Sequence, residues 1–147
     1  MKNSMIVRFA NQKDLDRVIE IENLSFLNPW NSDFLKNISK DIFLVSGNQQ
    51  IYGFLIAGCC YRNIKATILK IAVHPECRCK GIATNLLYKL LEILKDKQIT
   101  EVDVIVNELW EPAVSLYKKV GFKIISKVPY VPDNDAFYLM RLKLTQD

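Results

Sequence analysis

The stretch HPECRCKGIATNLL, residues 74–87, joins two segments with different patterns, and this joint constrains the fold more than any other part of the chain. The run ILKIAV before it is apolar and rich in β-branched residues, which favours a buried strand. The run at 84–95, TNLLYKLLEILK, repeats apolar residues at helical spacing, which favours an amphipathic helix. Between them lie Gly81 and the bases Arg78 and Lys80. The sequence therefore predicts a strand, a basic corner and a helix.

A corner of this kind exposes the first backbone N–H groups of its helix, where a partial positive charge favours phosphate. Gly81 allows close approach of a ligand to the backbone, and Ala83 is also small. Neither the P-loop pattern G-x4-G-K-S/T nor the dinucleotide pattern G-x-G-x-x-G is present. The corner is therefore either a diphosphate cradle of another kind or a plain turn with solvated bases.

The composition is that of an ordinary globular domain. The chain has 147 residues, half of them apolar and about a quarter charged, which predicts one domain over residues 1–147. No segment approaches the roughly 20 apolar residues that a membrane span needs, and residues 1–14 lack the apolar centre of a signal peptide. We therefore expect a soluble cytoplasmic protein with no membrane partner.

The charged and metal-binding residue types point away from two further classes of protein. The net charge of +4 is spread without a run of five bases, whereas nucleic-acid binding usually needs a denser patch. Of the four cysteines, Cys77 and Cys79 lack the spacing of a zinc site and have no second ligand pair downstream. We expect no nucleic-acid partner, no metal, and reduced structural thiols.

The patterns along the rest of the chain predict an α/β fold. Strands are predicted over residues 5–9, 42–46, 51–61, 66–73, 102–106, 122–127 and 136–144. Helices are predicted after a capping box at Asn11 and Asp14, and over residues 32–39, 82–96 and 112–120. The strand at 102–106 follows a helix and is rich in β-branched residues, so it should be parallel and buried. This order predicts a mixed sheet with helices on both faces.

A second motif, SLYKKVGF at residues 115–122, follows that parallel strand. Together with the corner, whose Arg78 to Ala83 fit the acetyl-coenzyme A pattern Q/R-x-x-G-x-G/A, it resembles the GNAT acetyltransferase superfamily. The resemblance covers nearly the whole chain. NPW near position 30, Lys70 to Val73 and the segment from Asp135 to Met140 are similar in particular to protein N-terminal acetyltransferases of the RimI-type ribosomal-protein alanine group and their archaeal relatives.

The resemblance implies that acetyl-CoA is the cosubstrate. The backbone of Ile71 to Val73 should pair with the pantetheine arm, and the amides of Cys79 to Thr84 should hold the pyrophosphate. Tyr117 falls on the tyrosine that protonates the departing thiolate, although Gly121 and Phe122 also predict that its ring packs at a helix end. The implied cofactor residues are Ile71, Ala72, Val73, Arg78, Cys79, Lys80, Gly81, Ile82, Ala83, Thr84 and Asn107.

The strand after the long helix departs from the family pattern. Bacterial relatives carry a glutamate base in a pattern like L-E-V-R, and Ile105, which cannot take a proton, stands at that position. Asp103, on the same strand face and about 6.8 Å away, is the first candidate to replace it. His74 has a suitable intrinsic pKa, but a histidine before proline is more often a turn residue. Glu76, which precedes Cys77, is the third candidate. The asparagine that contacts the cofactor arm aligns with Trp110 or has moved to Asn107.

On the acceptor side, the resemblance implies a slot between the segment at 27–30 and the one at 128–135. Trp30 and Tyr130 would wall this slot, or would simply cover the core. Three functions stay open: an acetyltransferase that acts on a protein or peptide N-terminus, an enzyme of the same fold that acetylates a small amine such as a polyamine, and a non-catalytic acyl-CoA-binding module. The expected oligomeric state is a monomer or a homodimer.

Overall fold

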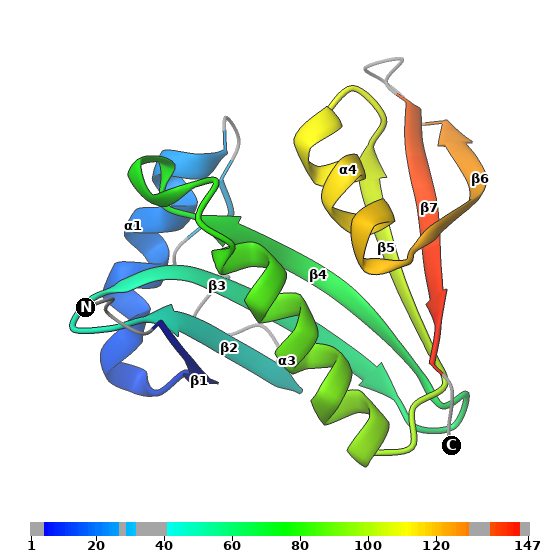
Figure 1. The fold of residues 1–147 in the computed structure, drawn as a ribbon, viewed down its shortest axis with the longest axis horizontal. Helices are drawn as coiled ribbons and strands as arrows, with labels where there is room; N and C mark the ends of the chain where they lie inside the picture. Colours follow the sequence, from blue (N-terminus) through cyan, green and yellow to red (C-terminus); the bar gives the residue numbers. More distant parts are fainter. Residues whose placement is uncertain (1–4, 27–28, 32–40, 130–135, 145–147) are drawn as a thin grey trace. The chain divides into compact units, whose positions relative to one another are not determined.

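The computed structural model describes residues 5–26, 29–31, 41–129 and 136–144, and Figure 1 shows its elements in chain order. The strands are β1 (Ile6–Phe9), β2 (Ile42–Gly47), β3 (Ile51–Cys60), β4 (Lys65–Val73), β5 (Glu101–Asn107), β6 (Lys123–Pro129) and β7 (Ala136–Lys143). The α-helices are α1 (Leu15–Ser25), α3 (Ile82–Asp96) and α4 (Glu111–Val120), with 3-10 turns η1 (Gln12–Asp14) and η2 (Pro75–Cys77). The helix predicted over 32–39 lies outside the described residues.

Within the described residues, seven strands form a sheet in the order β1-β2-β3-β4-β5-β7-β6. β5 pairs with β4 in parallel, over Lys65–Ile68 and Glu101–Val104, as predicted from its β-branched sequence. The pairs β1-β2, β2-β3, β5-β7 and β6-β7 are antiparallel. Chain contacts divide the protein into two compact units, unit 1 (residues 1–58 and 69–90) and unit 2 (residues 59–68 and 91–147).

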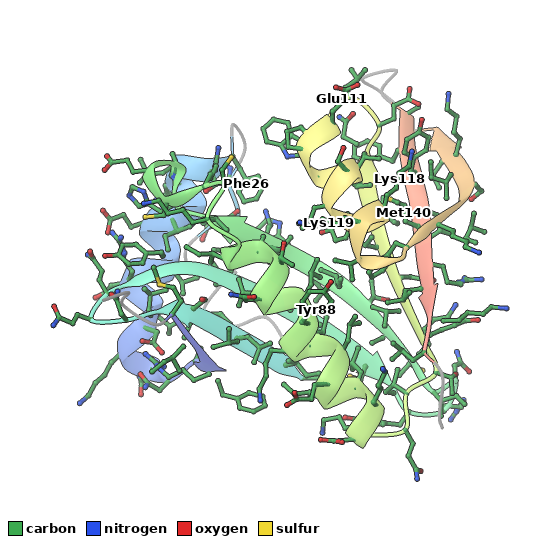
Figure 2. All side chains as sticks on the ribbon, in the orientation of Figure 1. Phe26, Tyr88, Glu111, Lys118, Lys119 and Met140 are labelled. Carbon is green, nitrogen blue, oxygen red and sulfur yellow. The ribbon has the colours of Figure 1, made fainter. Side chains whose placement is uncertain are left out.

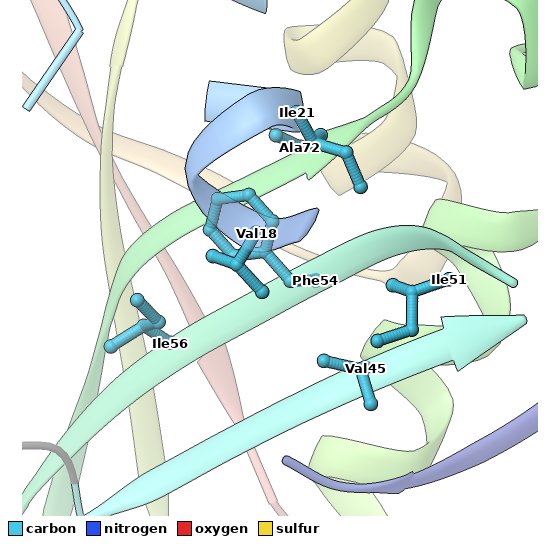
Figure 3. Packing of buried hydrophobic residues seen from close by; sticks show 7 residues of the cluster. All are labelled: Val18, Ile21, Val45, Ile51, Phe54, Ile56 and Ala72. Atoms are coloured by element: carbon cyan, nitrogen blue, oxygen red, sulfur yellow. The ribbon is translucent and has the colours of Figure 1, made fainter. Parts of the chain in front are cut away.

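In unit 1, α1 covers one face of the strands. Its buried residues Val18 and Ile21 pack with Val45 on β2, Phe54 on β3 and Ala72 on β4, together with Ile51 and Ile56 (Figure 3). The helix begins where the sequence predicted, because the Asn11 side chain accepts from the Lys13 N–H at 2.9 Å and the Asp14 carboxylate accepts from the Asn11 N–H at 2.7 Å. The capping-box prediction is confirmed, although it caps the short turn η1 that leads into α1.

The start of α3 packs on the opposite face of β3. Gly53 points away from the α1 side because it alternates with Phe54 along the strand. A Cβ at Gly53 would lie 2.9 Å from Ile82 Cγ2 and 3.1 Å from the Ala72 carbonyl oxygen. The glycine therefore lets the first turn of α3 sit directly on the sheet, and this contact sets the position of the corner before Ile82.

In unit 2, the helix α4 packs against the strand β5. Val102, Val104 and Val106 of β5 are buried, and α4, which carries the buried residues Val114 and Tyr117, packs against this strand. Figure 2 marks Met140 on β7 and Lys118 and Lys119 on α4. The alternate β5 residues Asp103 and Ile105 point to the other face of their strand. That face carries the position where a base was expected.

Candidate active site

The basic corner has the conformation that the sequence predicted. β4 ends at Val73, the turn η2 follows, and α3 begins at Ile82. The Asn85 N–H donates to the Gly81 carbonyl at 3.0 Å, so Gly81 is the residue at which the helical hydrogen bonding starts. Cys79 and Gly81 have φ values of 65° and 82°, which bend the chain twice within three residues. This left-handed backbone conformation is uncommon for cysteine and ordinary for glycine.

This bend leaves backbone N–H groups without partners. Among the described residues, none accepts a hydrogen bond from the amides of residues 79–84. An added Cβ at Gly81 would meet nothing within 4 Å. The corner therefore offers an open run of N–H groups at the positive end of a 15-residue helix, which is the arrangement that binds phosphate oxygens.

The end of β4 presents backbone groups along one edge. The His74 N–H donates to the Tyr52 carbonyl at 2.7 Å, so the alternation of the strand directs Ala72 toward β3 and Ile71 and Val73 toward the opposite edge. Arg78 Nε donates to the Val73 carbonyl at 3.1 Å and ties the corner to the strand. An extended ligand would therefore pair with Ile71 and the Val73 N–H, while Ala72 and the Val73 carbonyl are already engaged.

Trp30 lies beside the same strand within unit 1. The Lys70 ammonium sits 4.3 Å from the centre of the Trp30 ring and 3.8 Å from the centre of the Phe26 ring. The carboxylate of Glu22 accepts from Lys70 Nζ and from the Trp30 backbone N–H, both at 2.8 Å. The structure therefore brings the predicted acceptor residue Trp30 next to the strand predicted to bind the cofactor. Tyr130 lies outside the described residues.

Tyr117 is fixed by the end of α4. The Phe122 N–H donates to the Tyr117 carbonyl at 2.9 Å, the Gly121 N–H donates to the Lys118 carbonyl at 3.1 Å, and Gly121 has a φ of 121°. The Phe122 and Tyr117 rings meet edge to face with centroids 5.4 Å apart. This is the predicted Schellman motif with its hydrophobic contact. Tyr117 is 3% exposed, and burial raises the pKa of its hydroxyl.

Asp103 is held in an ion-pair cluster. Arg141 Nε and Nη2 donate to its two carboxylate oxygens at 2.7 and 3.1 Å, and Lys65 Nζ lies 3.3 Å from Oδ2. Asp103 is 8% exposed, and burial by itself would raise the pKa of its carboxyl group. Hydrogen bonds and charge attraction from Arg141 and Lys65 outweigh this effect and lower the pKa of Asp103. A proton acceptor of low pKa is weak at neutral pH. The assignment of Asp103 as the base stays a prediction, with a competing structural role.

Ile105, at the position of the expected glutamate, is 58% exposed. It pairs with Leu139 across β5 and β7. Asn107 ends the strand, and its side-chain oxygen accepts from the Leu109 N–H at 2.9 Å, which engages that oxygen in a turn before α4. Leu109 and Trp110 in that turn are exposed. Position 105 of β5 is thus accessible but carries no carboxylate, and the carboxylate of Asp103 on the same face is engaged by Arg141 and Lys65.

The structure also identifies charged residues that the sequence did not single out. Glu22 and Arg141 have no motif of their own, and their partners lie 48 and 38 residues away in the chain. His74 has the turn role that was weighed for it, because its Nδ1 accepts from the Glu76 N–H at 3.1 Å. All four cysteines are free thiols. In the described part of the chain, no helix has the length and apolar content needed to span a membrane.

The chain is similar in sequence and in fold to known proteins. A protein of Bacillus subtilis (strain 168), described as a candidate ribosomal protein bS18-alanine N-acetyltransferase, is 30% identical over 128 residues, covering 84% of this chain and 83% of the relative. The ribosomal-protein-S18-alanine N-acetyltransferase of Escherichia coli superposes with a TM-score of 0.85 at 20% identity, over 98% of this chain and 96% of that chain.

NAA60 of Arabidopsis thaliana in complex with acetyl-CoA superposes with a TM-score of 0.84 at 19% identity, over 95% of this chain and 99% of that chain. These likenesses confirm the predicted fold. The sequence profile described as "Acetyltransferase (GNAT) family" matches residues 15–122. The chain therefore belongs to the GNAT acetyltransferase family.

Proposed function

We propose that this chain transfers the acetyl group of acetyl-CoA to the N-terminal α-amine of a protein or peptide, with a ribosomal protein as the first candidate acceptor. The observation that carries the proposal is the corner at 78–84, where open backbone amides lie between the turn η2, which follows β4, and the start of α3. The relatives whose names describe ribosomal-protein alanine N-acetyltransferases support the acceptor class. We further propose that residues 1–147 act as one catalytic domain.

The corner suits the diphosphate of coenzyme A. The amides of Cys79 to Thr84 can donate to its oxygens, and Arg78 and Lys80 bring positive charge to the same turn. The outward backbone groups of Ile71 and the N–H of Val73 can pair with the amide groups of the pantetheine arm like an added strand. In this assignment Gly81 keeps the approach to the backbone clear, and Ile82, Ala83 and Thr84 form the helical turn on which the diphosphate rests.

The chemistry requires one proton to leave the amine and one to reach the sulfur. The neutral α-amine attacks the thioester carbonyl, the C–N bond forms, the C–S bond breaks, and coenzyme A leaves as a thiolate that takes up a proton. Tyr117 is the proposed donor of that proton. A tyrosine hydroxyl is protonated at neutral pH, and burial raises the pKa of Tyr117 further, so the proposed donor carries its proton when the thiolate forms.

The absence of a carboxylate at position 105 favours an α-amine over a lysine as acceptor. An α-amine has a pKa near 7.7–8.0, so removing its proton at pH 7 costs only about 1 kcal/mol. A lysine side chain, with a pKa of about 10.4, costs roughly 4.6 kcal/mol by the same arithmetic. Ile105 leaves the enzyme without a strong base on β5. The acceptor amine must therefore arrive neutral, and an α-amine does so far more often.

The acceptor is proposed to lie along the wall that Phe26 and Trp30 form beside β4. Tyr130, which lies outside the described residues, stays the second residue proposed for acceptor binding. Asn107 is proposed to contact the cofactor arm through its side-chain amide nitrogen, because its oxygen is engaged by the Leu109 N–H. Asp103 is retained as the proposed proton acceptor, in competition with its role as the partner of Arg141. We also propose that the protein is cytoplasmic, because the relatives named as ribosomal-protein N-acetyltransferases point to an acceptor in that compartment.

The test is acetyl-CoA turnover across three acceptor sets. The first is a library of short peptides that differ in their first residue, the second consists of lysine peptides with blocked N-termini, and the third consists of polyamines. The proposal predicts turnover on free N-termini and little on blocked lysine peptides. Turnover on blocked lysine peptides alone would contradict the α-amine assignment, and turnover on polyamines alone would establish a small-amine enzyme. Tight acetyl-CoA binding without turnover from pH 6 to 9 would establish a binding module.

A further inference from the structure

The buried cluster of Glu22 and Lys70 has the chemistry of an ammonium-binding site. Glu22 is 0% exposed, and its Oε2 accepts from Lys70 Nζ at 2.8 Å. The Phe26 and Trp30 rings approach the same ammonium, with centroid distances of 3.8 and 4.3 Å. Figure 2 shows Phe26 in its place beyond the end of α1. A carboxylate and two aromatic faces around one nitrogen form the arrangement that recognises cationic amines.

The cluster is too deeply buried to be an ordinary surface ion pair. The Lys70 side chain is 12% exposed, so its charge depends on the cluster for compensation. Among the residues that the structure describes, none donates a hydrogen bond to the buried Oε1 of Glu22. A buried carboxylate oxygen left in this way has a large desolvation cost. The cluster therefore has more capacity to accept N–H donors than its present occupant uses.

The neighbours of the cluster connect it to the acceptor side of the proposed reaction. Glu22 Oε2 also accepts from the Trp30 backbone N–H at 2.8 Å. Lys70 is followed directly by Ile71, the first residue of the β4 edge assigned to the pantetheine arm. The same carboxylate thus fixes the backbone of Trp30 and the lysine that lies under its ring.

We propose that Glu22, Phe26 and Trp30 form a cage for a primary ammonium, and that Lys70 permanently fills this cage. The filled cage positions the Phe26–Trp30 wall against β4, and it removes an ammonium-binding site that a diamine acceptor would otherwise use. Lys70 and Glu22 are positioning residues in this account. The part that concerns acceptors rests on the proposed function, whereas the cage itself does not.

The test empties the cage and refills it. Lys70→Ala removes three methylene groups and the ammonium, and n-propylammonium supplies the same atoms. Loss of one partner of a buried pair should lower the melting temperature by roughly 6–20 °C. Propylammonium at ten times its dissociation constant should then raise the melting temperature of Lys70→Ala by roughly 3–6 °C. The wild-type protein should show no such rise.

Two controls separate the cage from a plain cavity. 1-Propanol has nearly the same size and no charge, so it should stabilise Lys70→Ala much less. The double variant Glu22→Gln/Lys70→Ala keeps the cavity and removes the carboxylate, so propylammonium should not stabilise it. Equal stabilisation by propanol and propylammonium, or none by either in a folded Lys70→Ala protein, would overturn the cage.

The role in acceptor binding has a readout that fold stability does not move. In Glu22→Gln/Lys70→Met, where the charges are removed as a pair, the KM for the peptide acceptor should rise at least about tenfold, a 1.4 kcal/mol effect. Its dissociation constant for acetyl-CoA should stay within about twofold of the wild-type value. An unchanged peptide KM would overturn the acceptor role and leave the cage standing. Propylammonium rescue in a protein that acetylates no amine would leave the cage standing and reject the proposed function.

Labelling provides a measurement that needs no variant, in case Lys70→Ala does not fold. Acetic anhydride should modify Lys70 of the wild-type protein at least about tenfold more slowly than the exposed Lys80, because the ammonium is enclosed and hydrogen-bonded. Equal labelling of Lys70 and Lys80, read by mass spectrometry of the peptides, would overturn the claim that the cage is filled.

Discussion

The corner that opens α3 is proposed to bind the cofactor, and the strand β5 is proposed to carry the proton acceptor. The corner acts through backbone groups, whereas β5 acts through side chains. In the corner, the proposed ligand groups are backbone amides that Gly81 and the start of α3 place. On β5, the proposed chemistry depends on single side chains, and there Ile105 stands at the position where the sequence resemblance implied a glutamate base. A site built from backbone persists while side chains change, whereas a site built from side chains is lost with one substitution. The chain accordingly matches the family motif at the corner and departs from it on β5.

The largest expected effect comes from placing a charge in the corner. Gly81→Glu should abolish measurable acetyl-CoA binding, because a carboxylate would meet the pyrophosphate where an added Cβ now meets nothing within 4 Å. Gly81→Gln is the matched control, since it shares the strain of a side chain at a φ of 82° and lacks the charge. Calorimetry should show much weaker binding for the glutamate than for the glutamine variant. Unchanged affinity in a folded Gly81→Glu protein would reject the cradle.

The second effect concerns the proposed proton donor in unit 2. Tyr117→Phe keeps the edge-to-face contact with Phe122 and removes only the hydroxyl. The turnover number should fall by roughly ten- to ten-thousand-fold, the range for loss of general acid catalysis, with little change in acetyl-CoA affinity. Steady-state kinetics and calorimetry on the same preparation check both. Equal turnover numbers would assign Tyr117 to packing alone.

The sequence predicted best the features whose causes are local. The bounds of α3 at residues 82–96 match the prediction because an apolar stripe runs unbroken over four turns. The Schellman motif at Gly121 was predictable because Tyr117, Gly121 and Phe122 lie within six consecutive positions of the chain. The backbone corner belongs to this class, which is why its glycine and bases could be identified without a structure.

The sequence could not predict the pairs whose partners are brought together by register. Asp103 meets Arg141 because these residues lie opposite each other on β5 and β7, 38 positions apart. Glu22 meets Lys70 across 48 positions, between the end of α1 and β4. Neither pair has a local signal in the sequence. Asp103 could therefore be proposed as a base from the sequence, although in the structure Arg141 donates to both of its carboxylate oxygens.

The third prediction asks which role Asp103 has. Asp103→Asn should lower the free energy of unfolding at pH 7 by about 1–3 kcal/mol, because Arg141 loses a charged partner. Asp103 has a lowered pKa in the folded protein, so its contribution is present above the unfolded pKa of about 3.9 and is lost as pH falls through the folded pKa. The difference between wild type and variant should therefore shrink below pH 4.

Urea unfolding at pH 7 and at acid pH measures this difference, with Asp96→Asn as a control at an exposed carboxylate. Turnover decides the other role of Asp103. A fall of a hundredfold or more in the turnover number of a folded Asp103→Asn protein would establish it as the proton acceptor. A fall of less than tenfold would assign it to holding Arg141.

The smallest effect should come from restoring the missing carboxylate on β5. The wild-type rate on an N-terminal peptide should climb with pH until the α-amine has titrated near pH 8, because no strong base collects its proton. Ile105 is 58% exposed, so a glutamate there can be solvated at little cost in stability. Ile105→Glu should therefore raise the rate at pH 6, where only about 1–2% of the amine is neutral, by up to about tenfold.

The gain from Ile105→Glu should be much smaller at pH 9, because nearly all of the α-amine is then neutral and no base is needed to convert the ammonium into the attacking amine. Ile105→Gln separates the carboxylate from its shape, since it has the same length and polarity but accepts no proton, and it should leave the wild-type pH profile unchanged. A gain that is equal at pH 6 and pH 9, or that glutamine reproduces, would show that position 105 acts through acceptor binding. The corner and β5 would then differ in which substrate they contact, and the pKa of the acceptor amine would no longer explain how this enzyme works without a glutamate.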